Sequence, residues 1–433
     1  MAAYPFVLAE HRWLRYTTFF ALYVVQGVPS GFALTAVANY LAAEGVPSWE
    51  IGRFIAIVGL PWTLQFVWGP LIDRFQDSPM GRRRPWVLCA QGCAFLASLM
   101  LLRIDDPSTQ LNLLACAFLG HSVFASIQDA SVDAMAITLT SVDERGRVNA
   151  FMRGGMLTGS ALGAAGFAYL LRAYGFRTAA LLQAVLLFSM MLATFFLKEQ
   201  RADRWITWPG TARASSLCSY DVPHTLRTLF LRLFRGLTRA VSLRFFAVIA
   251  VVYLAQSVFQ RTMAVYLIQE LGWQDTELSL LSGTVGTAVA VGVALAGGIL
   301  ADRLGARRML AGVGLGNGLF LLTFALLLAV SHTTAWLAGG MTLSYLMDPV
   351  FSVAAFPILM ALCVPGVEGS QFTTYMALIN LADVAGAYLS GWLLPLVPAP
   401  FLVLAAGGTL VSNAILIGYL MRRVPSEAFP ARA

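Results

Sequence analysis

The feature that most constrains this chain is a short charged motif that occurs twice between long apolar runs. The first copy begins at Gly69–Arg74 with GPLIDR and, after an insert, ends at Gly81–Arg84 with GRRR. The second copy, residues 298–308, repeats the spacing G-x-x-x-D-R-x-G-x-R-R without an insert, 229 residues later (298 − 69). Tyr23–Gln26 (YVVQ) likewise recurs as Tyr253–Gln256 (YLAQ), 230 residues later (253 − 23). Two agreeing offsets predict two homologous halves, which in a membrane protein are typical of a transporter with its substrate site between them.

The composition places the chain in a membrane. Of its 433 residues, 58% are hydrophobic and 12% are charged, and the mean hydropathy is +0.72, whereas soluble domains carry about 25% charged residues. Because a helix that crosses a bilayer needs about 20 apolar residues, this length accommodates roughly twelve spans. The apolar runs are continuous, while barrel strands alternate apolar and polar residues. We therefore expect an all-α integral membrane protein with about twelve helices in two pseudo-symmetric bundles of about six.

The basic residues predict the orientation of the chain. A formal net charge of +7 would suggest nucleic acid as a partner of a soluble protein, but in a membrane protein Lys and Arg mark the cytoplasmic loops. The sequence thus predicts both termini in the cytoplasm, the lipid bilayer as a partner, and no nucleic acid. The five cysteines show no metal-ligand spacing, so we expect neither a metal nor a cofactor. We expect a monomer.

A polar segment divides the chain into the two expected bundles. They comprise residues 1–197 and 242–433, and residues 198–241 form a cytoplasmic linker. Within the linker, leucines and phenylalanines of residues 226–237 form an apolar stripe, and arginines including Arg235 and Arg239 lie toward the other side. A basic amphipathic helix of this kind is expected to lie on the membrane surface.

The fourth expected span is the most polar of the first half. It carries His121, Gln128, Asp129 and Asp133, and the two aspartates, four residues apart, share one helical face. Charged residues within a span normally face a water-filled path or an opposite charge. For Asp129 a role in proton or substrate transfer competes with a structural role, and for Asp133 we favour a salt bridge with the loop arginines. His121 lies two turns before Asp129, either on the same pathway or as an interhelical hydrogen-bonder.

The fifth expected span is rich in glycine. Gly154, Gly155, Gly159 and Gly163 include pairs at the spacing small-x-x-x-small. In lipid this spacing lets two helices approach closely, so the span is expected to pack tightly against a neighbouring helix.

The repeated motif predicts cytoplasmic gates, because an Asp-Arg pair at the end of a span sits where lipid gives way to water. A basic loop that only orients the chain is the alternative for either copy alone, and the duplication argues against it. The residues expected to gate are Asp73, Arg74, Arg82, Arg83, Asp133, Asp302 and Arg303.

Other polar residues within apolar runs are candidates for the substrate or proton pathway. Gln26 begins the stretch Gln26–Gly31, whose proline and glycines predict a bent or broken first span. Arg261 lies well inside an apolar run, where it would bind an anionic group or pair with a buried acid, Asp348 or Asp383. The remaining candidates in the second half are Gln256, Gln260 and Asn380.

Several stretches resemble the AmpG-type muropeptide permeases and their relatives in the peptide and acetyl-CoA transporter group of the major facilitator superfamily. The matching stretches are Ser30–Gly31, Phe66–Arg74 with Gly81–Arg84, Gln128–Asp129, Asp133–Ala134, Glu144–Gly146, Gln371–Phe372 and Gly391–Trp392. The resemblance implies a permease of the bacterial inner membrane that imports small molecules, anhydro-muramyl disaccharides with or without peptide, by proton symport. A sister group that imports siderophores shares the Gln-Asp pattern and stays open as an alternative.

Two further classes of function compete with this interpretation. An exporter of drugs or metabolites with the same fold would share the duplicated halves and the buried acids. An intramembrane enzyme could use Asp129, Asp133 and His121, but no nucleophile or metal-ligand constellation accompanies them in the sequence. We therefore expect a transporter and not an enzyme.

Overall fold

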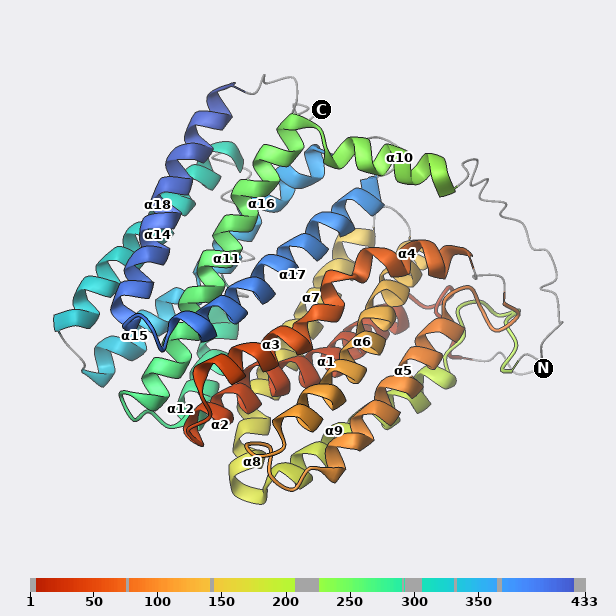
Figure 1. Ribbon diagram of the computed structural model, residues 1–433. Helices are drawn as coiled ribbons and strands as arrows, with labels where there is room; N and C mark the ends of the chain where they lie inside the picture. The colour runs from red at the N-terminus through yellow and green to blue at the C-terminus, as the bar shows by residue number, and fades with distance from the viewer. Residues whose placement is uncertain are drawn as a thin grey trace. The chain divides into compact units, whose positions relative to one another are not determined.

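A computed structural model describes residues 5–74, 78–140, 144–206, 226–289, 292, 306–330, 333–363 and 368–423. The regular secondary structure of the described chain is helical, apart from an isolated bridge between Val7 and Lys198. Ten of its helical stretches are long and apolar enough to cross a membrane. The other two expected spans are the eighth, which is only partly described, and the tenth, which is divided into two helices. The prediction of an all-α membrane fold is confirmed (Figure 1).

Most of the described helices are α-helices, and π-helical segments interrupt them in places. Up to residue 206 the helices are α1 (Arg12–Gly31), the π-helix η1 (Phe32–Val37), α2 (Ala38–Ala43), α3 (Ser48–Thr63), α4 (Gln65–Arg74), α5 (Arg84–Leu99), the 3-10 turn η2 (Met100–Arg103), α6 (Leu111–Leu139), α7 (Arg145–Ala161), the π-helix η4 (Leu162–Gly166), α8 (Phe167–Tyr174) and α9 (Phe176–Phe195). From residue 226 they are α10 (Leu226–Leu237), α11 (Ala240–Gln269), α12 (Asp275–Leu280), the π-helix η5 (Leu281–Gly286), α14 (Ala306–Val330), α15 (Thr334–Ser344), α16 (Met347–Ala361), α17 (Glu368–Leu393) and α18 (Ala399–Arg423).

The helices pack into two compact units. Unit 1 comprises Met1–Val37 and Leu64–Asp221, and unit 2 comprises Ala38–Thr63 and Val222–Ala433. Packing thus assigns α2 and α3 to unit 2, where α3 lies along α17. The division of the sequence into bundles of residues 1–197 and 242–433 stays a prediction.

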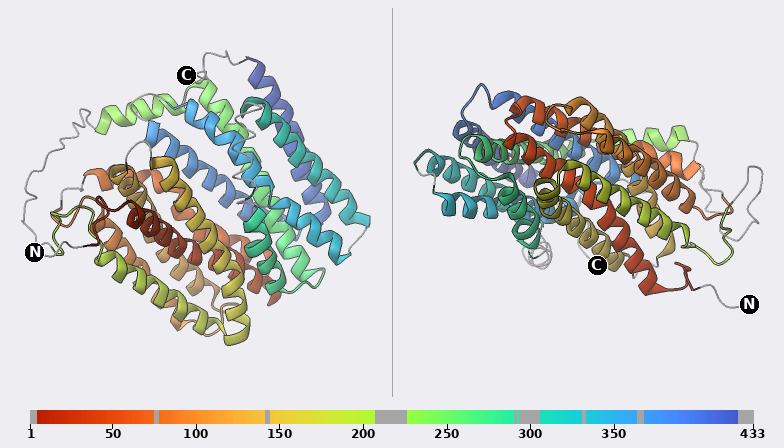
Figure 2. Two further views of the ribbon diagram at one scale, coloured as in Figure 1. Left: turned by 180° about the vertical axis from the view of Figure 1, so that it is seen from behind. Right: turned by 90° about the horizontal axis from the view of Figure 1, so that it is seen from below.

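Glycines bring α1 and α7 of unit 1 into close contact, and the two helices lie side by side in Figures 1 and 2. A Cβ atom on Gly159 would lie 2.1 Å from the carbonyl oxygen of Val24, and one on Gly163 would lie 2.1 Å from that of Val28. Small residues at such spacing are the usual means of close packing between helices in lipid. The tight packing that these glycines predict is therefore confirmed.

The first span changes its helical form just after the stretch where the sequence predicts a bend or break. α1 continues through Pro29, and the chain then becomes the π-helix η1 at Phe32. This segment packs against η4, the π-helix that continues α7. The irregularity is thus a change of helix type a few residues after the proline, and π-helical segments of this kind are frequent at functional sites.

Candidate functional site

Two acidic side chains of α6 form the centre of a buried polar cluster in unit 1. Asp129 accepts one hydrogen bond from Nε2 of Gln26 in α1, at 2.7 Å, and another from Nε2 of Gln65 in α4. One turn further on, Asp133 accepts a hydrogen bond from the hydroxyl of Tyr23 in α1. The structure thus brings together Gln26, Asp129 and Asp133, which the sequence selects as pathway or gate residues.

The side chains that donate these hydrogen bonds to the two carboxylates are neutral. Asp129 is 9% exposed and Gln26 is 6% exposed, so the cluster lies in the interior of the unit. Arg153 of α7 interacts electrostatically with both acids, although its own side chain is exposed. An ionised carboxylate inside a protein is stable only when it is paired or well hydrogen-bonded. Because the hydrogen-bond donors of these two acids are neutral, a change in the hydrogen bonds can shift the acids between the ionised and the protonated form. Such a cluster is suited to bind and release a proton.

His121 takes part in a different polar contact. Its Nδ1 is 3.0 Å from the hydroxyl oxygen of Ser98 in α5, and Gln183 of α9 donates its amide N–H to that same oxygen at 3.2 Å. Asp129 faces α1 and α4, whereas His121 faces α5 and α9, so the structure does not bring the two residues together. Gln128, the residue that precedes Asp129, is also buried.

Sequence reasoning missed three members of the cluster. Tyr23 carries a signal, since it recurs as Tyr253 in the duplicated stretch, but the repeat by itself does not point to a hydrogen bond with an acid. Gln65 stands at the start of α4 within an apolar run, and no pattern in the sequence singles it out. Arg153 has the pattern of a residue that extends toward water from the end of a helix, which hides its interaction with the acids.

The predicted gate residues are only partly described. Arg82 is half-buried and Arg83 is buried. Asp133 accepts a hydrogen bond from the hydroxyl of Tyr23. The side chains of Asp73 and Arg74 lie outside the described residues, as do Asp302 and Arg303 entirely. Gating by this set therefore stays a prediction.

The loop of the first motif is tied to the segment that follows α9. Oε1 of Glu199 accepts hydrogen bonds from the backbone N–H groups of Arg83, at 2.7 Å, and Arg84, at 2.6 Å, and so caps the N-terminus of α5. Gly81 has φ of +124°, and a Cβ there would lie 2.7 Å from the Glu199 carboxylate. Only glycine suits this position, because it tolerates the left-handed backbone and leaves room for the carboxylate.

Burial raises the pKa of Glu199, and the nearby carboxylate of Asp203 raises it further. The hydrogen bonds from the backbone of Arg84 and Arg83 act against this and lower the pKa. Glu199 follows the sixth expected span and lies outside it. The corner formed by Glu199 and the start of α5 is therefore more stable when this carboxyl is protonated.

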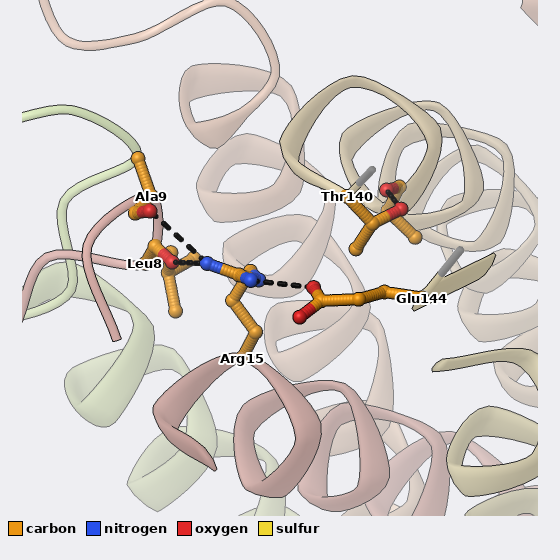
Figure 3. A network of polar contacts seen from close by, with 6 residues as sticks. Leu8, Ala9, Arg15, Thr140 and Glu144 are labelled. Carbon is orange, nitrogen blue, oxygen red and sulfur yellow. Dashed lines mark hydrogen bonds and ion pairs between the residues drawn. The ribbon is translucent and has the colours of Figure 1, made fainter. Parts of the chain in front are cut away.

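The N-terminal segment is bound to the same region. Leu8 donates its backbone N–H to the carbonyl of Lys198 at 2.9 Å, and Ala9 donates to that of Glu199 at 3.1 Å. Figure 3 shows Arg15 between the carbonyls of Leu8 and Ala9 on one side and Glu144 on the other, with 2.6 Å between the guanidinium and the Glu144 carboxylate. These contacts join the starts of α1 and α7 to the end of α9.

The candidates of the second half lie in unit 2, where Gln256 is buried and Gln260 and Arg261 are half-buried. Arg261 interacts electrostatically with Tyr345. Of its two predicted acidic partners, Asp348 is exposed in the first turn of α16, and Asp383 forms no ion pair within the described part of the chain.

The two remaining polar candidates of unit 2 lie on α17. Asn380 and Asp383 are both half-buried. The backbone carbonyl of Asp383 accepts a hydrogen bond from the hydroxyl of Ser257 in α11, at 2.7 Å. The patch that the sequence predicts on this helix is thus in contact with α11, the helix that also carries Arg261. Within the described residues no group of three or more His, Cys, Asp or Glu side chains could hold a metal ion.

Long apolar helices that carry a buried acid cluster in one unit and an arginine within a span of the other are typical of membrane transporters. The sequence matches the Major Facilitator Superfamily over residues 61–260 and 245–433, and the chain belongs to this family of secondary transporters.

Relatives and a solved structure agree with this assignment. The chain is 26% identical to an uncharacterised protein of Haemophilus influenzae, over 82% of this chain and 84% of that protein. It is 25% identical to the anhydromuropeptide permease of Escherichia coli, over 86% and 73% respectively. A crystal structure of a mutant peptide transporter POT with alafosfalin matches with a TM-score of 0.71 at 12% identity, covering 99% of both chains. The last likeness shows the fold alone.

Proposed function

We propose that this chain is a proton-coupled importer of cell-wall muropeptides, anhydro-muramyl disaccharides with or without peptide, in the inner membrane of a bacterium. It works as a monomer with both termini in the cytoplasm, and it exposes its substrate site alternately to the two sides of the membrane. The identity of 25% to an anhydromuropeptide permease over most of the chain supports the substrate class.

The observation that carries the proton coupling is the Asp129 cluster. A carboxylate that lies in a dry interior and is held by neutral donors can load a proton at one side and release it at the other, because small changes in its surroundings shift the balance between its two forms. Gln26 and Gln65 hold Asp129 on both oxygens. Movement of α1 or α4 against α6 would remove these donors and favour the protonated carboxyl. This is the coupling that proton symport requires.

Replacing Asp129 by Asn tests this role. In vesicles with an imposed proton gradient, we expect Asp129→Asn to abolish uphill accumulation of an anhydro-muramyl peptide. Exchange of labelled for unlabelled substrate should persist, because exchange needs no net movement of protons. The matched control is Asp105→Asn, since Asp105 is an exposed acid in the loop before α6, and it should leave both activities unchanged.

Three results would contradict the proposal in different ways. Full accumulation by Asp129→Asn would place the coupling at another acid, with Asp383 and Asp348 next in line. Absence of anhydro-muramyl peptide uptake by the wild-type protein, together with proton-driven uptake of a ferric siderophore, would assign the chain to the siderophore importers. Proton-driven efflux of the substrate would make it an exporter.

A further inference from the structure

The two predicted halves of the sequence are joined within unit 2. Residues 38–63 precede the linker and so belong to the first predicted half, but α2 packs against α11 and α12, and α3 lies along α17. All three of these partner helices come from the second half. A transporter built from two homologous halves opens its site to one side of the membrane when the halves separate at that side. Contacts between the halves at one end are therefore candidates for a gate.

Two amide side chains make these contacts in a reciprocal way. Asn39 of α2 donates a hydrogen bond from Nδ2 to the hydroxyl oxygen of Ser279 in α12, at 2.8 Å. Gln269, the last residue of α11, donates from Nε2 to the carbonyl oxygens of Ala42, at 3.1 Å, and Val46, at 2.8 Å. The two amides lie 230 residues apart (269 − 39), which is the offset between the two copies of the tyrosine–glutamine stretch. Each half thus contributes one amide, from an equivalent position, that bonds to the other half.

The next helix along the chain, α3, meets α17 through small residues. The hydroxyl of Ser48 donates to the carbonyl oxygen of Gly391 at 3.0 Å. A Cβ atom on Gly391 would lie 2.6 Å from the carbonyl oxygen of Ser48, and one on Gly52 would lie 2.8 Å from that of Ala387. Backbones at this distance leave no room for water between them, so the contact is dry while it lasts.

The amide contacts are of a kind that can break and re-form. Asn39 and Ser279 are 5% and 0% exposed, so their hydrogen bond is shielded from water in this structure. When the two segments part, water takes the place of each lost partner, and the net cost of breaking such a bond is therefore small. The close contact between α1 and α7 differs, because both helices belong to the first half and need not separate.

We propose that Asn39 and Gln269 form an amide clasp that closes the outer gate of the transporter, with Ser48 and Gly391 as the adjoining dry contact. This inference rests on the proposed function, because alternating access requires such a gate and because termini in the cytoplasm would place the ends of α2 and α11 outside. The clasp residues are gating residues that bind no substrate. They set how long the substrate site stays closed to the outside.

Labelling of a buried cysteine measures how often the clasp opens. Ala42, which is 2% exposed, is replaced by Cys in a background without the five native cysteines, and a membrane-impermeant maleimide is added to intact cells. The thiol reacts only while the gate is open, so Asn39→Ala and Gln269→Ala should each speed labelling about five-fold. Gln274→Ala is the matched control, since this nearby amide is exposed, and it should leave the rate unchanged.

Gly391→Val tests the dry contact with a change that keeps both amides of the clasp. The added side chain would meet the carbonyl oxygen of Ser48 at 2.6 Å, so we expect labelling of Ala42→Cys to be about ten-fold faster or more. Gly408→Val in α18 is the control, because a Cβ there would meet nothing within 4 Å. A second reporter, Ala406→Cys, is 5% exposed in α18 and should stay unlabelled in every variant.

Unchanged labelling in Asn39→Ala, Gln269→Ala and Gly391→Val would overturn the gate. Equally fast labelling of Ala406→Cys in all three would also overturn it, since the substitutions would then unfold unit 2 and not open a gate. Labelling of Ala42→Cys only after the membrane is permeabilised would place the clasp at the cytoplasmic side and contradict an outer gate. None of these measurements needs a substrate, so absence of anhydro-muramyl peptide uptake by wild type would refute the proposed function and leave the gate standing.

Discussion

Single side chains in this protein are held by partners from distant parts of the sequence, and Glu199 is the clearest case. Its carboxylate caps α5 from a position 116 residues away, through the N–H groups of Arg83 and Arg84. The buried guanidinium of Arg84 packs against the rings of Phe195 and Trp205. The motif loop is therefore fixed by the end of α9, and one substitution in either segment should loosen both.

Glu199→Gln and Glu199→Leu should separate the charge of this residue from its hydrogen bonds. Glutamine keeps an acceptor oxygen for both N–H groups, whereas leucine leaves two buried donors unsatisfied, which costs about 1–3 kcal/mol each. Thermal denaturation of the purified protein at neutral pH should place the leucine variant well below wild type and the glutamine variant at or above it. Equal destabilisation by both would show that the negative charge itself is needed.

The same pair of variants should reveal a pH dependence. Burial raises the pKa of Glu199 from its ordinary value of 4.5, so its contribution to stability is fully present below pH 4.5 and is lost as pH rises through the folded-state pKa. The difference in thermal transition between Glu199→Gln and wild type should therefore grow in favour of the variant as pH rises above 4.5. A constant difference across that range would contradict the raised pKa.

Arg261 is expected to act in binding and not in proton coupling. Arg261→Lys keeps the positive charge but loses the planar fork, so we expect about ten-fold weaker substrate binding in both exchange and uphill uptake. Arg244→Lys, at an exposed position of the same helix, is the control. Normal binding with loss of uphill uptake alone would move Arg261 from the substrate to the coupling mechanism.

At the scale of elements, the glycines of α7 decide how closely α1 can approach. The interior of unit 1 has several such contacts, and the one at Gly159 is among the tightest, with the backbone of Val24 opposite. Because backbone atoms cannot move aside as a flexible side chain can, α1 and α7 can pack against each other in only one register.

Gly159→Ala should destabilise the protein strongly. The added methyl group would lie 2.1 Å from the Val24 carbonyl, and overpacking of this kind costs about 1–3 kcal/mol or more. Gly154→Ala on the same helix is the control, since a Cβ there would lie 3.9 Å from the nearest atom, in Phe20, and alanine favours helix. Retained folding can be measured by the fraction that stays monodisperse after heating in detergent. Similar losses for both variants would show that the close contact between Gly159 and Val24 is not what decides stability.

The elements and part of the candidate site could be predicted from the sequence, for reasons that differ. The spans follow from continuous apolar runs, and Asp129 and Asp133 stand out because charges are rare in lipid. Spacing along α6 suggests that His121 lies near Asp129, but eight residues turn a helix about 80° past the same face, enough for His121 to meet α5 and α9 instead. Gln65 and Glu199 contribute through tertiary contacts, which leave no periodic pattern in the chain.

For the whole molecule, the predicted orientation of unit 1 places the two ends of its helices on opposite sides of the membrane. The end that joins the N-terminal segment to the chain after α9 should face the cytoplasm, because Arg15, Arg83, Arg84 and Arg201 gather there. Asp105, in the loop between η2 and α6, is at the other end of α5. This orientation follows from charge alone.

Single cysteines at Arg201 and Asp105, both exposed, test it in a background without the five native cysteines. In intact cells, a membrane-impermeant maleimide should label Asp105→Cys and spare Arg201→Cys until the membrane is permeabilised. The reverse pattern would show that the protein has the opposite orientation in the membrane, and the proposed direction of proton-driven transport would then be reversed as well. Labelling of both from outside would require an even number of crossings between the two positions, whereas α6, α7 with its continuation α8, and α9 make three. The assignment of spans in unit 1 would then have to be revised.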